Sequence, residues 1–186
     1  MPNWCYNAIT ISGTEESLNV LDENFAKARE HKGTESCFGE KWLGQMVEYL
    51  GYDASKVRCR GYILDYHHTP EEICISTETA WGPLLEPILL MVEKFAPDSE
   101  ITYFCEEPGC DIYLTNDPTL EGKYILDVWD DEISDYERDP LSHDELKDWL
   151  EDILKKKKGL PSLLKEALSE YDFCVHQYEY CAIEEL

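Results

Sequence analysis

The amino-acid sequence predicts an α+β protein of 186 residues, with a sheet-forming core followed by a mainly helical extension. Two hydrophobic patterns lead to this prediction. Some segments alternate apolar and polar residues, which is typical of half-buried strands, and others repeat apolar residues every three or four positions, as amphipathic helices do. Hydrophobic residues make up 43% of the chain, which suffices for a buried core and excludes a disordered protein.

The N-terminal part predicts one strand and two helices. Residues 4–12 alternate and predict a strand, and Thr14 is placed to cap a helix with apolar residues on one face. After a loop rich in Gly, Thr and Ser, the apolar residues between Trp42 and Leu50 predict a second helix that ends at Gly51. The chain therefore opens as a strand followed by two helices.

The middle of the chain predicts two hairpins, a helix and a further strand. The strand-like segments are residues 57–66, 72–79, 101–106, 110–115 and 123–129. Pro83 stands where the first turn of a helix accepts proline, and this helix is expected to continue to Phe95. The order of elements is then βαββαβ, with one inserted helix and one added strand. The simplest arrangement is the split βαβ pairing of a ferredoxin-like fold, with helices on one face of the sheet.

The last part of the chain differs in composition, and we expect it to be a separate extension. Ser142 and Glu145 form a capping-box pattern at the start of a helix, and Gly159 is expected to end this helix. Pro161 is expected to open a second helix, which a final strand follows. We therefore expect a ferredoxin-like core over residues 1–130 and an acidic, mainly helical extension over 131–186.

Four segments resemble a known family, the YubB/Api92-like ferredoxin-like proteins of phages, plasmids and bacterial genomes. The segments are Met1-Pro2-Asn3-Trp4-Cys5-Tyr6-Asn7, Gly61-Tyr62-Ile63, Thr79-Ala80-Trp81-Gly82-Pro83 and Glu106-Glu107-Pro108-Gly109-Cys110-Asp111. The resemblance implies a ferredoxin-like fold and an association with mobile genetic elements. It implies no catalytic mechanism, and it does not extend beyond Trp129.

The family-like residues are candidates for lining a ligand cleft, because polar groups beside aromatic rings and a glycine-bearing hairpin suit small-molecule recognition. These candidates are Trp4, Asn7, Trp81, Pro83, Glu107, Gly109 and Asp111. The alternative is that Trp4 and Trp81 pack the junction between sheet and helices, while Asn3 or Asn7 caps a turn.

The charge balance limits the partners that the chain can have. Asp and Glu number 40 against 16 Lys and Arg, a formal charge of −24. This charge argues against direct nucleic-acid binding and against docking on an anionic membrane, since both need cationic groups. Residues 98–152 hold 19 acidic and 3 basic residues. Candidates for binding a basic partner are Asp127, Asp130, Asp131, Glu132, Asp135 and Glu137; alternatively, the acidity only keeps the protein soluble.

Metal and catalytic sites are weakly indicated. Cys105, Cys110, Cys174 and His176 lack the spacing of a zinc knuckle, and buried reduced thiols are the simpler interpretation. His67 and His68, near Asp65 and Glu71, have no nucleophile placed beside them by any local motif, and the acidic group after residue 127 lacks the EF-hand order. The sequence therefore assigns no catalytic residue, metal ligand or cofactor.

Compartment and function follow as expectations. The N-terminus has no basic segment before an apolar run, so we expect a cytoplasmic protein with reduced cysteines. One expected function is that of a non-enzymatic acidic protein binding a basic host protein, including as a nucleic-acid mimic that inhibits a defence system. The alternative is a small-ligand or nucleotide-binding domain, with hydrolysis as one variant, using a cleft around Trp4, Trp81 and Glu107. The sequence predicts no oligomeric state.

Overall fold

A computed structural model describes residues 3–34, 36–133 and 139–186. The chain is α+β, as the hydrophobic patterns predict, and it divides into two compact units. The first unit comprises Met1–Asp117 together with Cys181–Leu186, and the second comprises Pro118–Tyr180.

The first unit is built on an antiparallel sheet. Its strands are β1 (Trp4–Ser12), β2 (Gly61–His68), β3 (Glu72–Ala80), β4 (Glu100–Glu107) and β5 (Ile112–Thr115). Within this unit they lie in the order β2-β3-β1-β4-β5, and each strand runs antiparallel to its neighbours. β1 is central, and its alternate residues from Cys5 to Ile11 are buried, as the period-two pattern predicts.

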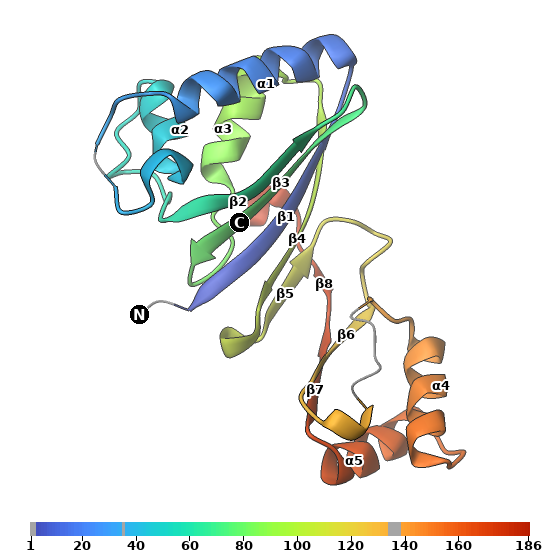
Figure 1. Ribbon diagram of the computed structural model, residues 1–186. Helices are drawn as coiled ribbons and strands as arrows, with labels where there is room; N and C mark the ends of the chain where they lie inside the picture. The colour runs from blue at the N-terminus through green and yellow to red at the C-terminus, as the bar shows by residue number, and fades with distance from the viewer. Residues whose placement is uncertain (1–2, 35, 134–138) are drawn as a thin grey trace. The chain divides into compact units, whose positions relative to one another are not determined.

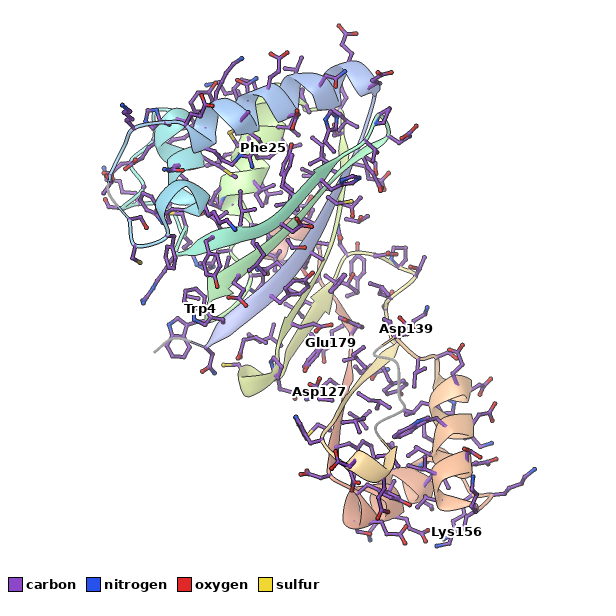
Figure 2. The ribbon with its side chains drawn as sticks, in the orientation of Figure 1. Trp4, Phe25, Asp127, Asp139, Lys156 and Glu179 are labelled. Carbon is purple, nitrogen blue, oxygen red and sulfur yellow. The ribbon has the colours of Figure 1, made fainter. Side chains whose placement is uncertain are left out.

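Helices cover one side of this sheet. They are α1 (Glu15–Arg29), α2 (Gly44–Tyr49) and α3 (Glu86–Phe95), and Figure 1 shows all three on the same side. Short 3₁₀ turns are η1 (Gly39–Lys41), η2 (Pro108–Cys110) and η4 (Ile183–Glu185). Phe25 points from α1 toward the sheet (Figure 2) and is 1% exposed. Thr14 caps α1 by accepting a hydrogen bond from the Ser17 N–H, as predicted.

Two helix boundaries differ from the sequence prediction. α3 begins at Glu86, and Pro87 rather than Pro83 occupies its first turn. Pro83 instead lies in the connection between β3 and α3, because the backbone turns sharply at Trp81, which has a positive φ of 72°. α2 is also shorter than expected, since Trp42 is in an extended conformation.

The second unit has its own sheet, helices and core. Its elements are β6 (Tyr124–Val128), η3 (Asp131–Ile133), α4 (His143–Leu154), α5 (Leu160–Glu170), β7 (Phe173–Gln177) and β8 (Glu179–Tyr180). β6 pairs antiparallel with β7, and Leu126, Leu150 and Leu163 are buried in a core of this unit. The predicted capping box of Ser142 and Glu145 is present at the start of α4.

The expected boundary at residues 130/131 falls inside the second unit. The predicted strand 123–129 corresponds to β6, which pairs with β7 from much later in the chain, and this pairing places it outside the first unit. Gly159 is not the stop of α4: Lys155 adopts the left-handed conformation there, and Gly159 precedes α5.

Because each unit buries its own hydrophobic cluster, core substitutions are expected to act locally. Leu150→Ala removes a fully buried side chain from the second unit and should destabilise that unit by about 2–5 kcal/mol. In the full chain, hydrogen exchange should accelerate mainly in residues 118–180. Leu21→Ala is the matched change in the first unit, and it should accelerate hydrogen exchange mainly in that unit. Equal loss of protection in both units from either variant would contradict separate cores.

Candidate functional site

The four family-like segments meet at one end of the first unit's sheet. The strand registers pair Trp4 with Ala80, Gly61 with Thr79 and Tyr6 with Glu106. The start of β1, the start of β2, the end of β3 and the turn between β4 and β5 therefore lie close together. The predicted cleft residues belong to these segments, but their side chains have different surroundings.

Asn7 is fully buried and serves as a hydrogen-bonding centre between strands. Its Nδ2 lies 2.9 Å from Thr79 Oγ1 and 3.1 Å from both Thr77 Oγ1 and the Cys5 carbonyl oxygen. Thr79 Oγ1 in turn donates to the carbonyl oxygen of Gly82 at 2.7 Å. A chain of hydrogen bonds thus runs from the central strand to the turn that follows β3, so Asn7 has a positioning role in the interior.

Trp4 packs among aromatic rings. Its ring meets Phe38 edge-on at 5.9 Å and Tyr62 at 5.6 Å, and Phe38 stacks on Tyr62 at 5.1 Å. Figure 2 shows Trp4 at the start of β1. These contacts match the packing interpretation of Trp4.

Glu107, Gly109 and Asp111 build the turn between β4 and β5. Glu107 is 3% exposed, and its Oε1 accepts the Gly109 N–H at 3.1 Å. Asp111 adopts the left-handed conformation with φ 55° after η2. The Cys110 thiol has a raised pKa because its hydrogen bond to the Glu107 carboxylate favours the protonated form. This group therefore shapes the hairpin.

A cavity of about 480 Å³ lies at the same end of the sheet. Its lining residues are Trp42, Ala54, Val57, Arg58, Cys59, Arg60, Ala80, Trp81 and Leu84, and we call it the Trp81 pocket. Of the predicted cleft residues, Trp81 lines it, and Pro83 lines an adjoining hollow of about 220 Å³. Trp4, Asn7 and Glu107 are not among the lining residues, and the prediction did not include Trp42, Arg58 or Arg60.

Trp81 is held at the rim of this pocket in an unusual backbone conformation. Its φ of 72° is in the left-handed region, which is strained for a large side chain, and the side chain is 56% exposed. The Trp81 N–H donates to the Asn3 carbonyl oxygen at 2.9 Å, and the preceding Ala80 N–H donates to the Arg60 carbonyl oxygen at 3.0 Å. These bonds join the turn after β3 to the start of β1 and to the segment before β2.

Other lining residues come from Trp42 and from the segment 54–60. A Cβ at Gly44 would overlap the Trp42 ring, so only glycine lets this indole lie against the start of α2. Cys59 donates from Sγ to the Ala54 carbonyl oxygen at 3.3 Å. Burial raises the pKa of the Cys59 thiol, and Glu48 and Glu86 raise it further. The thiol is therefore neutral near pH 7 and is a poor nucleophile.

Of the two adjacent histidines, His68 contacts a carboxylate of the first unit. His68 Nδ1 lies 3.5 Å from Asp22 of α1, and the same carboxylate accepts the Tyr66 hydroxyl at 2.7 Å. Burial and this hydrogen bond raise the pKa of Tyr66. His67 is exposed. The Asp22 contacts therefore join α1 to β2.

The predicted partner-binding acids have mixed roles in the second unit. Asp127 of β6, labelled in Figure 2, lies 3.7 Å from His176 Nε2. Asp130 accepts the Glu132 N–H at 2.9 Å and the Asp172 N–H at 3.3 Å, while the side chains of Asp131 and Glu132 are exposed. Asp135 and Glu137 lie outside the described residues.

Within residues 3–34, 36–133 and 139–186, no group of three or more His, Cys, Asp or Glu side chains is arranged to hold a metal ion. In the same ranges, no helix has the length and apolar character needed to cross a membrane. No family model, curated protein or solved structure compared with the chain matches it.

The Glu107 carboxylate is expected to control the reactivity of the exposed Cys110 thiol. In Glu107→Gln the amide is neutral, so the pKa of Cys110 should fall and a larger thiolate fraction should form at pH 8. Alkylation of Cys110 by iodoacetamide, followed by mass spectrometry, should therefore be faster than in the wild type. Cys37, which is also exposed, serves as the internal control. An unchanged or slower rate at Cys110 would refute this assignment.

Proposed function

We propose that this chain is a cytoplasmic, non-enzymatic binding protein whose first unit holds a small ligand in the Trp81 pocket. The pocket itself carries the proposal, because it combines a ligand-sized volume with a strained and exposed tryptophan at its rim. Binding is favoured over reaction, since the lining includes no His, Asp, Glu or Ser side chain, and the raised pKa of the Cys59 thiol in the lining keeps it protonated near pH 7.

The proposal includes a ferredoxin-like fold for the first unit and membership of the YubB/Api92-like family of mobile genetic elements. The antiparallel strand order β2-β3-β1-β4, with α1 and α3 on one side, supports the fold. The meeting of all four family-like segments beside the pocket supports a shared binding surface. Of the expected cleft around Trp4, Trp81 and Glu107, this proposal keeps Trp81 and places the ligand in the pocket beside it.

A second candidate function is the binding of a basic host protein by the acidic surface, including as a nucleic-acid mimic. With 40 carboxylates against 16 cations, one-to-one pairing leaves at least 24 carboxylates without a cation. By sequence, the first unit has a net charge of −15 and the second −9, so both units contribute to the field that would attract such a partner. Asp131 and Glu132 are exposed at the surface of the second unit.

Ligand binding in the pocket should depend on the Trp81 indole. A panel of nucleosides, nucleoside monophosphates and aromatic acids is screened by thermal shift, and at least one compound should stabilise the wild type. Trp81→Ala should abolish that stabilisation, because it removes the ring at the rim. Trp129→Ala, which removes an equally exposed tryptophan from the second unit, should retain it.

Circular dichroism would establish that both variants are folded. Equal stabilisation of Trp81→Ala and Trp129→Ala would show that the compound binds elsewhere. If no compound of the panel stabilises the wild type, the pocket proposal fails and the basic-partner function becomes the better account.

A further inference from the structure

The Trp81 pocket gathers positive charge in a strongly acidic unit. Arg58 and Arg60 both line it, although the first unit has only 8 Lys and Arg against 23 Asp and Glu. Neither arginine forms an ion pair with an Asp or Glu side chain in the described parts of the chain, although Arg58 donates a hydrogen bond to the Leu186 backbone oxygen. Because no Asp or Glu side chain pairs with either guanidinium group, the two arginines of this cavity keep hydrogen-bond donors available to an anion.

The two arginines are not equivalent. Arg58 Nη1 donates to the Leu186 backbone oxygen at 3.3 Å, and Arg58 also lines the adjoining hollow together with Glu86. Arg60 lines the Trp81 pocket and does not line the adjoining hollow, and its backbone is fixed by the hydrogen bond from the Ala80 N–H. Arg60 is therefore the better placed anchor, and Arg58 contributes less because it has a protein acceptor.

Two of the residues that line the same cavity, Trp42 and Trp81, carry indole rings. Aromatic rings pack well against the faces and edges of other rings, and the remaining lining from Ala54, Val57 and Leu84 is apolar. A cavity of this size also falls within the range of about 300–1,000 Å³ that small-ligand sites occupy. The pocket thus combines apolar and aromatic walls with cationic donors.

We propose that the Trp81 pocket takes a small anion with a flat aromatic ring, in which the ring packs against Trp42 and Trp81 and the phosphate or carboxylate binds Arg60. This inference rests on the proposed binding function and specifies its ligand class. It is compatible with the charge argument against nucleic-acid binding, because a short anion needs only the local arginines, whereas a long polyanion would meet the repulsion of the whole acidic surface.

Two matched pairs of probes test the ligand class by calorimetry on the full chain. The pairs are adenosine 5′-monophosphate with adenosine, and indole-3-acetate with indole. At least one anion should bind about tenfold or more tightly than its neutral partner, and higher ionic strength should reduce this difference. Comparison of the two anions distinguishes a phosphate from a carboxylate as the charged group.

Arg60→Gln should remove most of the preference for the anion. Lys56→Gln, in the same loop but outside the lining and paired with Asp53, should preserve it. Equal binding of a neutral compound and its anion through Trp81 would overturn the anion class while leaving the binding function in place. An anion preference that persists in Arg60→Gln would also overturn the proposal, as would failure of all four probes to bind the wild type.

Discussion

The first unit depends on satisfying one buried amide in its central strand. An amide transferred out of water without hydrogen bonds costs about 1–3 kcal/mol in proteins, so the fully buried Asn7 requires partners. It finds them in the hydroxyl groups of Thr77 and Thr79 on β3, and these bonds favour one register between the two strands. Because Thr79 passes the interaction on to the carbonyl oxygen of Gly82, the same network defines the turn that presents Trp81.

This network connects the fold to the proposed site. The end of β3 fixes Trp81 in a strained conformation at the rim of the pocket, while the bond from Ala80 to Arg60 aligns the facing segment. Positive charge is concentrated locally: a unit with a net charge of −15 has two arginines on one cavity, and neither pairs with an Asp or Glu side chain in the described residues. The high negative charge and the basic pocket are compatible. The overall charge repels long polyanions and attracts basic macromolecules, whereas the pocket arginines attract a small anion inside the cavity.

Local patterns in the sequence predicted the elements well, whereas contacts between distant segments were harder to predict. Alternation located β1 and its inward Asn7, and side-chain caps located the starts of α1 and α4. The helix start at Pro83 was wrong because the strained turn at Trp81 intervenes, and the strand at 123–129 pairs with a late partner that no local pattern specifies. Trp81 was the lining residue that motifs could identify. Arg58 and Arg60 line the pocket because two segments that are separate in the sequence meet there. The sequence feature that could have pointed to them is a pair of arginines two positions apart in a strongly acidic chain.

The most direct test of this account compares Thr79→Val with Thr77→Val. Both replace a buried hydroxyl that contacts Asn7 by a methyl group of similar size, but only Thr79 also holds the Gly82 carbonyl. The measurement is the affinity of folded variants for whichever aromatic probe binds the wild type most tightly. Thr79→Val is expected to weaken binding by about tenfold or more, whereas Thr77→Val should leave the affinity close to the wild-type value. Equal affinities in the two variants would contradict the claim that the Asn7 network positions the Trp81 pocket.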